Sequence, residues 1–476
     1  MPTASSTETL HRTGNKIFWA LPAVLPLIIL VLAMAHPAEG NVQVTPQSVR
    51  VGIAQMINDS SFTVHGKYRL IDNYSEDVVG VPREGEVWQV KPFGNGINVW
   101  ADNKPVGSFV GPLSLEAEKH RVHIMSGNGS LIQKDAAELA VQSAAGSVSY
   151  LDDGLAELWA QGENITAALS PAGVMNLSEI RIGTRQPFRT YRGDFEFRRT
   201  GDGLLVINQL GIEEYLYGVV PAEIQSQFPA EAIKAQAVAA RSYLISNLGN
   251  YSSHGFDILS TQNSQVYKGY EAEDLRTSRA IDATRGEVLI FRGRPIPAFF
   301  HASSGGYTEN SEDIWSAVLP YIRTKADPLD SGGGNKHYNW QVTYSQQELL
   351  NQLAAQDYKF QTIGDLKVLA MTASGKRVKT MRITGTGEDG SPKVVDVKNA
   401  NNVRSALGLK SALFDIIKSV DDTGHLKEIT ITGDGWGHGL GLSQWGARGM
   451  AEKGYNYREI LQYYYTGVSI AGDYGL

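Results

Sequence analysis

Residues 215–243 read YLYGVVPAEIQSQFPAEAIKAQAVAARSY, and this stretch decides how the larger part of the chain is organised. It begins with an apolar, strand-like run that ends at Pro221, and Glu223 follows just after that run. A helix is predicted from about residue 229 to residue 247, because Pro229 suits a first helical position. Acidic residues at the end of an element often lie at the rim of a binding site. Glu223 is therefore the first candidate for chemistry.

The predicted helix carries two cations on one face. Lys234 and Arg241 are seven residues apart, which places them about two turns apart along a helix. The alanines between them allow close packing against another element. The two cations are thus candidates to anchor a polar ligand and to hold Glu223 in place. Spacing alone nevertheless favours a plainer interpretation, in which Glu223 is a solvated loop acid and both cations are surface charges.

Two further stretches have compositions typical of a binding site. Residues 433–447 read GDGWGHGLGLSQWGA, in which alternating glycines let the backbone approach a ligand and Trp436, His438 and Trp445 suit stacking on sugar rings. A tight glycine-rich corner with tryptophans in the core explains this pattern equally well. Residues 298–310 read AFFHASSGGYTEN, and we expect a loop beside a cleft, because no G-x-S-x-G elbow supports a serine nucleophile.

Composition and charge exclude several classes of protein. The 476 residues carry a formal net charge of -7, and no basic cluster of the kind that follows nucleic-acid phosphates is present. The chain has no cysteine, which excludes disulfides, cysteine-ligated zinc, iron–sulfur clusters and thiol catalysis. Nucleic acid is therefore not an expected partner.

The N-terminus predicts export. Arg12 and Lys16 precede an apolar run over residues 17–35, which closes with Ala33-Met34-Ala35. This order of charged, apolar and small residues is typical of a secretory signal, and the run is also close to the length that spans a bilayer. We expect residues 1–40 to be a signal peptide or a membrane anchor. The rest of the protein is then expected in the periplasm or cell wall, with membrane contact only through this segment.

The remaining sequence predicts an α+β protein. Residues 41–195 contain short alternating runs separated by turn signals, which is typical of a β-rich N-terminal domain. Residues 196–476 mix strand patterns with helices and form the expected catalytic part. We expect its helices at about residues 229–247, 273–284, 345–355 and 457–466. We expect strands at residues 204–207, 377–385 and 426–432.

Several stretches of this second part, taken together and in order, resemble the SpoIID/LytB family of stage II sporulation protein D and amidase enhancers. The stretches are residues 215–223, 234–241, 264–269, 303–306, 403–411 and 436–447. The resemblance covers roughly residues 195–470. It implies activity on the glycan strands of peptidoglycan. It also places the family's catalytic glutamate on Glu223 and its supporting basic residues on Lys234 and Arg241.

The resemblance implies further substrate contacts but no metal. The expected contacts are Tyr267, Ser303, Ser304, Trp436, His438, Gln444 and Trp445. Some family members bind zinc through cysteines and a histidine just before the Gln-Val-Tyr motif. Residues 258–264 contain neither residue type, so we expect no zinc and no other cofactor.

Three functions are open. A lytic transglycosylase would use Glu223 as acid, then base, to cleave the bond between N-acetylmuramic acid and N-acetylglucosamine in peptide-stripped strands, leaving 1,6-anhydro ends. A non-catalytic protein would bind peptidoglycan and enhance a cell-wall amidase or another wall hydrolase. A conventional hydrolase needs a second carboxylate, for which Asp313 and Asp434 are candidates. The resemblance favours the first function, for which one acid suffices.

A proton donor that works near neutral pH needs a raised pKa. We therefore expect partial burial of Glu223. Cations beside the acid would lower its pKa again. We accordingly expect Lys234 and Arg241 to contact the substrate more than the acid, and we expect the cleft between Glu223 and residues 433–447.

Overall fold

The computed structural model describes residues 48–118 and 176–474, apart from residues 184, 316, 333, 423, 424 and 473, together with the backbone of short strands elsewhere. It mixes helices with many strands, and its N-terminal part is rich in strands, so the predicted α+β class is confirmed. The predicted export segment, residues 1–40, lies outside the residues whose side chains are described. Within the described part of the chain, no helix is both long enough and apolar enough to cross a membrane.

The chain divides into two compact units. Unit 1 comprises Met1–Pro46 and Arg50–Leu210, and unit 2 comprises Gln47–Val49 and Gly211–Leu476. The sequence placed this division near residue 195, whereas the structure places it at Gly211. The difference arises because the strand predicted at residues 204–207 pairs with the strand before it, in the sheet of unit 1.

Unit 1 contains two antiparallel sheets that pack face to face. Within unit 1, six strands of the first sheet follow the order β3 (Ser48–Ile57), β19 (Gly203–Gly211), β18 (Asp194–Thr200), β10 (Leu113–Ala117), β5 (Tyr68–Asp72), β6 (Asp77–Gly80). The second has the order β17 (Arg189–Arg192), β16 (Leu177–Ile182), β4 (Ser60–His65), β7 (Trp88–Phe93), β8 (Gly96–Ala101), β9 (Lys104–Phe109). Phe62 of β4 stacks on Phe197 of β18 with 5.5 Å between ring centroids, so aromatic rings join the two inner faces.

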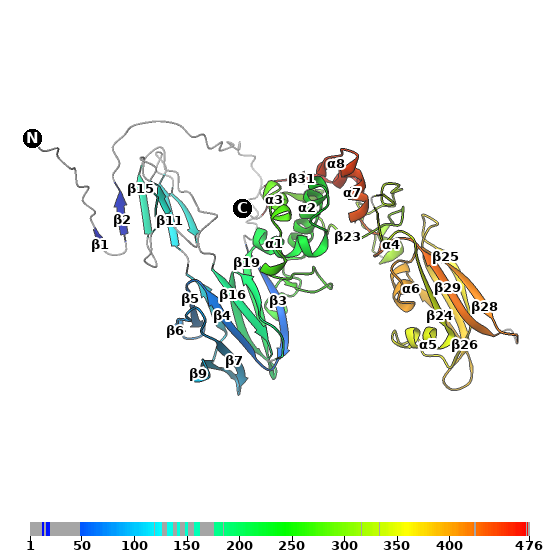
Figure 1. Ribbon diagram of the computed structural model, residues 1–476, viewed down its shortest axis with the longest axis horizontal. Helices are drawn as coiled ribbons and strands as arrows, with labels where there is room; N and C mark the ends of the chain where they lie inside the picture. Colours follow the sequence, from blue (N-terminus) through cyan, green and yellow to red (C-terminus); the bar gives the residue numbers. More distant parts are fainter. Residues whose placement is uncertain are drawn as a thin grey trace, which may run out of the picture. The chain divides into compact units, whose positions relative to one another are not determined.

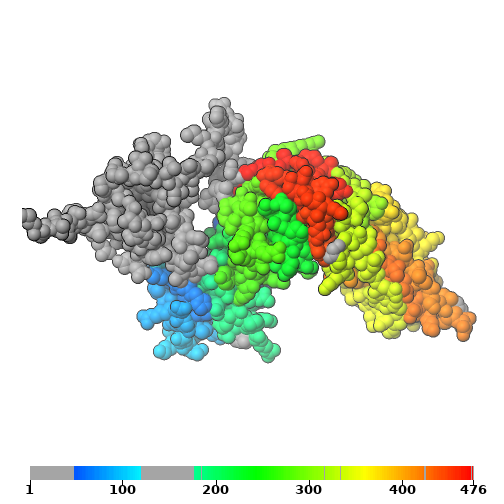
Figure 2. Space-filling view, turned by 45° about the horizontal axis from the view of Figure 1, so that its top comes forward, coloured from blue at the N-terminus to red at the C-terminus, as the bar shows by residue number. Residues whose placement is uncertain are grey.

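Unit 2 is organised around the helix α2 (Ala230–Asn247), which is buried along most of its length. Its alanines leave room for other helices to approach on several sides. These are α1 (Ile212–Glu223), α3 (Leu275–Ala283), α7 (Gln444–Glu452) and α8 (Tyr457–Tyr464). Figures 1 and 2 show the C-terminal helices α7 and α8, coloured red, against the green helices near the start of the unit.

A segment with two three-stranded sheets lies between α3 and α7 in the sequence. One sheet has the order β24 (Trp340–Ser345), β29 (Leu426–Gly433), β28 (Phe414–Val420), and the other has the order β25 (Thr362–Met371), β26 (Val378–Thr386), β27 (Pro392–Lys398). The helices α5 (Gln346–Ala354) and α6 (Ala400–Ala406) lie beside these strands (Figure 1). Both sheets and both helices share one hydrophobic core, which includes Leu349, Ile383, Val403 and Ile431.

Most of the predicted helices and strands of unit 2 are present, because local signals define their ends. The four helices predicted after residue 228 correspond to α2, α3, α5 and α8. Capping boxes form at Ser345 with Glu348 and at Asn456 with Glu459. The predicted strands at residues 377–385 and 426–432 correspond to β26 and β29.

The strand-like interpretation of residues 215–221 is wrong, because this segment belongs to helix α1. Val219 and Val220 resemble a strand, but the buried residues Ile212, Tyr215, Leu216 and Val219 recur at helical spacing. The helix carries Pro221 in its last turn and ends at Glu223. The candidate acid therefore lies at the C-terminal end of a buried helix, where the helix dipole disfavours a negative charge.

Candidate active site

Glu223 is partly buried at the end of α1 and accepts one backbone hydrogen bond. The N–H of Val266 donates to Glu223 Oε1 at 3.0 Å. Burial raises the pKa of this carboxyl above its ordinary value of 4.5, although the Val266 N–H and the charge of Lys268 act in the opposite direction. Within the described residues, no second carboxylate shifts this pKa. Glu223 thus holds its proton to a higher pH than an ordinary glutamate does.

Residues 265–269 hold the acid in place by packing along α1. Gly218 allows this contact, since a Cβ there would lie 2.7 Å from Tyr267 Cε2. Tyr267 is buried and stacks on Tyr215 with 5.1 Å between ring centroids. The hydroxyl of Tyr215 donates to Gln265 Oε1 at 3.3 Å, and the amide of Gln265 donates to the Ala240 carbonyl on α2. Tyr267, predicted to contact substrate, therefore supports the backbone that positions Glu223.

Arg241 lies on the predicted helix, but its side chain contacts protein groups rather than making the substrate contact that the sequence predicted. Its side chain has no exposed surface, so it cannot contact a substrate in this conformation. Its Nε and Nη2 donate to the two carboxylate oxygens of Glu213 at 2.9 and 2.6 Å. Its Nη1 and Nη2 also donate to the carbonyls of Glu287 and Ile281. The guanidinium therefore joins the start of α1 to α2 and to the chain on either side of Gly286.

Lys234 also has its own partners. Its Nζ lies 2.7 Å from Glu231 Oε1 and 5.7 Å from the centre of the Tyr457 ring. The cation whose charge acts on Glu223 is instead Lys268, an exposed residue that follows the Gln-Val-Tyr motif. Sequence reasoning missed Lys268. Its position beside Tyr267 in the motif was the only available signal.

Ser303 and Ser304 are fully buried and bind two carboxylates rather than facing solvent. Ser303 Oγ donates to Asp330 Oδ2 at 2.6 Å, and Ser304 Oγ donates to Asp327 Oδ2 at 2.9 Å. Asp330 also accepts the hydroxyl of Ser443 at 2.6 Å and the N–H groups of Ser304 and Gly305. This buried carboxylate fastens the 303–306 loop to the N-terminus of α7. No local pattern in the sequence indicates this role.

The 433–447 loop divides its two tryptophans between surface and core. Trp436 is 44% exposed, and the centre of its ring lies 5.2 Å from Lys410 Nζ. Its ring also contacts the His337 ring edge to face. Trp445 is buried against Phe228, which matches the alternative of a tryptophan in the core. Gln444 is buried beside α2, where its amide donates to Gln236 Oε1 at 3.4 Å. Trp436 is therefore the tryptophan available to a ligand.

The alternating glycines of this loop approach protein side chains. A Cβ on Gly437 would lie 2.7 Å from His301 Cβ, and one on Gly439 would lie 2.7 Å from Arg377 Nε. Both glycines also adopt positive φ angles of 117° and 82°. The expected close approach of the backbone is thus present, but the atoms it approaches are His301 and Arg377.

Four partly exposed rings form a row that we call the aromatic strip: Tyr243, Phe299, Trp315 and His438. Successive ring centroids lie 5.8, 4.5 and 4.9 Å apart. Burial raises the pKa of Tyr243, and the charges of Tyr251 and Glu223 add to this increase, so the strip begins within reach of the charge of Glu223. A row of partly exposed rings within reach of the acid is a surface on which sugar rings can stack.

The two acids considered as second carboxylates have other partners. Asp313 accepts Lys379 Nζ at 2.6 Å and the Ala373 N–H at 2.9 Å. Asp434 accepts the Asn339 N–H at 3.0 Å. In the described part of the chain, no group of three or more histidine or acidic residues is arranged to hold a metal ion.

Comparison with known proteins relates two segments of the chain to sequence families. Residues 200–291 match a family described as Stage II sporulation protein (SpoIID), and residues 310–441 match a Domain of unknown function (DUF8618). A Stage II sporulation protein D of Bacillus amyloliquefaciens is 34% identical over 56% of this chain and 75% of its own length. An uncharacterized protein of Brachyspira hyodysenteriae is 36% identical over 60% and 73%. An Amidase enhancer of Bacillus subtilis is 31% identical over 54% of this chain and 40% of its own length.

Replacing Arg241 is expected to destabilise unit 2 strongly. Arg241→Met leaves the buried Glu213 carboxylate without its partner, which costs about 3–5 kcal/mol of unfolding free energy. Lys234→Met is the control, because its partly exposed pair with Glu231 contributes about 1 kcal/mol or less. Denaturant unfolding of both variants measures the difference. Equal losses would contradict a structural role for Arg241.

Replacing Asp330 is expected to loosen the 303–306 loop. Asp330→Asn places an amide donor where hydroxyl and N–H groups already donate, so we expect a loss of about 3 kcal/mol in unfolding free energy. Asp415→Asn, at an exposed acid of β28, is the matched control and should change little. Chemical denaturation followed by tryptophan fluorescence checks both values. A loss of unfolding free energy no larger than that of the control would contradict the view that Asp330 holds the 303–306 loop in place.

Glu223→Gln is expected to stabilise the protein at alkaline but not at acid pH. A carboxyl with a raised folded-state pKa contributes stability below its unfolded pKa and loses that contribution as the pH rises through the folded-state pKa. Glutamine remains neutral and can still accept the Val266 N–H. The variant should therefore melt above the wild type at pH 8, with the gap closing towards pH 4. A constant gap across this range would show that Glu223 is not titrating as described.

Proposed function

Because the chain belongs to the SpoIID family of stage II sporulation proteins, a family with a cell-wall-related role, we propose that it is a peptidoglycan lytic transglycosylase. Its substrate would be peptide-stripped glycan, cut between N-acetylmuramic acid and N-acetylglucosamine. The observation that carries the proposal is the single, partly buried Glu223 with a raised pKa. One acid is sufficient for this reaction, because the nucleophile is the substrate's own hydroxyl.

The reaction uses the two protonation states of Glu223 in turn. Val266 N–H occupies Oε1, so the proton to be transferred is carried on Oε2. Glu223 donates it to the glycosidic oxygen as the bond from that oxygen to the muramic C1 breaks. The muramic 6-hydroxyl oxygen then bonds to C1 and gives its proton to Glu223. The products are a 1,6-anhydromuramic end and a free 4-hydroxyl on N-acetylglucosamine, and the acid is regenerated without water.

The surroundings of Glu223 suit both halves of this cycle. Burial keeps the proton on the acid before the reaction, and the Lys268 charge and the Val266 N–H stabilise the carboxylate that forms in the middle of it. The aromatic strip gives the sugars a surface next to the acid. In this proposal Arg241 positions α1 and does not touch the glycan, since its guanidinium is fully buried on Glu213.

The comparison with an Amidase enhancer favours a second candidate function. In that case the protein binds glycan through Trp436 and the aromatic strip and stimulates a cell-wall amidase without cleaving the strand itself. The two candidates differ at Glu223. An enhancer that lacks chemistry of its own would keep its effect on the amidase when Glu223 is replaced by glutamine.

A water-dependent hydrolase is less well supported by the described residues. Asp313 is bound by Lys379, and neither Asp313 nor Asp434 shifts the pKa of Glu223. Paired catalytic carboxylates in glycosidases lie close enough to influence one another. Reducing ends that incorporate oxygen from labelled water would nevertheless identify this reaction directly.

Digestion of peptide-stripped glycan tests the proposed function. Wild-type protein should release products with 1,6-anhydro ends, and Glu223→Gln should reduce their rate by about 100-fold or more through loss of the general acid. The rate should also fall as the pH rises above the pKa of Glu223, because the acid then loses its proton. Mass spectrometry of the products is the measurement.

The control for this digestion is Glu388→Gln, which removes an exposed carboxylate beyond β26 and should leave the rate unchanged. Products with ordinary reducing ends would contradict a transglycosylase. Anhydro products that form equally fast with Glu223→Gln would show that Glu223 is not the acid of the reaction.

A further inference from the structure

Arg404 on α6 is a partly buried guanidinium that has no carboxylate partner within the described residues. Its Nη2 donates to Asn401 Oδ1 at 3.1 Å, and its Nε is buried without a hydrogen-bond partner in the protein. Burial lowers the pKa of Arg404, and no nearby acid offsets that effect. Arg241, Arg323 and Arg377 are also buried or partly buried, but each of them faces a carboxylate. Arg404 thus bears the cost of partial burial without an acid to compensate.

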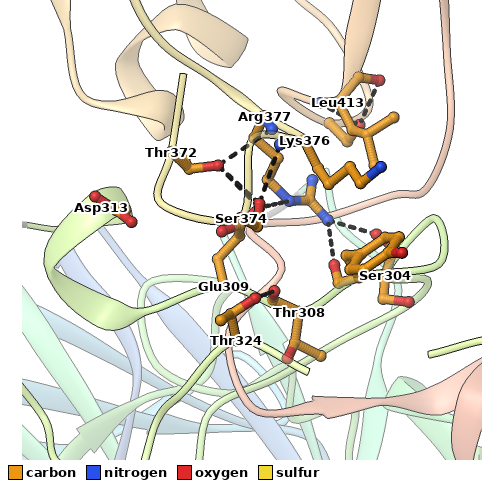
Figure 3. Close-up of polar contacts among 12 residues, drawn as sticks. Ser304, Thr308, Glu309, Asp313, Thr324, Thr372, Ser374, Lys376, Arg377 and Leu413 are labelled. Atoms are coloured by element: carbon orange, nitrogen blue, oxygen red, sulfur yellow. Dashed lines mark hydrogen bonds and ion pairs between the residues drawn. The ribbon is translucent and has the colours of Figure 1, made fainter. Parts of the chain in front are cut away.

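A second guanidinium with free donors lies close to Arg404. Arg377 is fully buried, and Figure 3 shows it between Glu309 and the Ser304 carbonyl. Its Nε stands 3.6 Å from Glu309 Oε1, and that oxygen accepts the hydroxyls of Thr372 and Ser374. The Nε and Nη1 of Arg377 have no hydrogen-bond partner in the protein. Arg377 directly precedes β26, which contacts α6, and the charge of Arg404 adds to the effect of burial in lowering the pKa of Arg377.

These cations make the surroundings of His438 positive. Burial lowers the pKa of His438 to about 3, and the charges of Arg404 and Arg377 contribute to that decrease. The pKa of the buried His301 is also lowered, by burial and then by His438 and Arg377. In this protein of net charge -7, the charges of Glu309 and Asp330 oppose the lowering of the Arg377 pKa, whereas no acid does so for Arg404. An arrangement of this kind suits an anion that arrives with a ligand.

The position of Arg404 relates this charge to the proposed reaction. His438 is the last ring of the aromatic strip, and Tyr243, at the other end, is within reach of the charge of Glu223. Trp315, which is 37% exposed, comes directly after the short helix α4 (Ser311–Ile314), and α4 contacts α6. A glycan lying along the strip from Glu223 would therefore extend towards α6, the helix that carries Arg404.

We propose that Arg404 is a specificity residue that binds the free lactyl carboxylate of a muramic acid residue in peptide-stripped glycan. This inference rests on the proposed function for the identity of the ligand. In stripped strands every muramic acid ends in a free lactyl carboxylate. Where a stem peptide is attached, the same carbon is a neutral amide. One guanidinium at this position therefore distinguishes the two forms of the strand, because only the carboxylate supplies the missing acid.

Binding measurements in a Glu223→Gln background test this inference without any turnover. The ligands are a peptide-free oligosaccharide of alternating N-acetylglucosamine and N-acetylmuramic acid, the same oligosaccharide with its lactyl carboxylates converted to methylamides, and an N-acetylglucosamine oligomer of equal length. We expect the carboxylate form to bind about tenfold or more tightly than the other two, as measured by calorimetry. Oligosaccharides that carry stem peptides should bind like the methylamide, although their peptides contain other carboxylates.

Two substitutions then assign that preference to Arg404. Arg404→Gln should weaken binding of the carboxylate form about tenfold and leave the two neutral ligands unchanged, whereas Arg404→Lys should retain part of the preference. Arg279→Gln, which removes an exposed arginine of α3, is the control and should alter none of the three affinities. Thermal melts of all the variants show whether a loss of binding comes from unfolding.

Three outcomes overturn the inference: equal binding of all three ligands, equal weakening of all three by Arg404→Gln, and absence of glycan binding. Its failure is distinguishable from failure of the proposed function. Anhydro products formed without an Arg404-dependent preference would reject the inference alone. An Arg404-dependent preference without anhydro products would reject the transglycosylase and keep the carboxylate subsite.

Discussion

The buried ion pair between Arg241 and Glu213 is the constraint on which the geometry around the acid depends. Glu213 lies in the first turn of α1, and its Oε1 also accepts the Gly286 N–H. Arg241 adds bonds to the carbonyls of Ile281 and Glu287. One charge pair thus fixes α1, α2 and the chain that follows α3 relative to one another. Because Glu223 is the last residue of α1, the ion pair sets the position of Glu223 from about three turns away along the helix.

The sequence was sufficient to predict those parts of unit 2 that depend on neighbouring residues. Capping boxes at Ser345 and Asn456 define the starts of α5 and α8, and both boxes form. The glutamate at the end of residues 215–223 could be selected as the acid only through the family resemblance. Its burial and its bond from Val266 require residues 43 positions away, which no local pattern contains.

The same limit explains why residue types were recognised more reliably than their roles. Lys234, Arg241, Tyr267 and Ser303 were all expected to contact substrate, and the structure gives each of them protein partners. A motif predicts which residue type stands at a position. Whether that side chain packs inside the protein or faces a ligand depends on its burial in the folded chain. Asp330, which accepts bonds from two distant serines, has no motif of its own in the chain.

The candidate acid Glu223 and the cation Arg404, which has no carboxylate partner within the described residues, belong to different segments of the chain. Glu223 belongs to the part that matches the sporulation family, whereas Arg377, Arg404 and Lys410 belong to residues 310–441. Arg377 Nη2 donates to the Ser304 carbonyl, which lies between the two segments, and the Gly437 N–H donates to the Lys410 carbonyl within residues 310–441. The proposed bond cleavage and the proposed recognition of the strand therefore depend on residues of different segments.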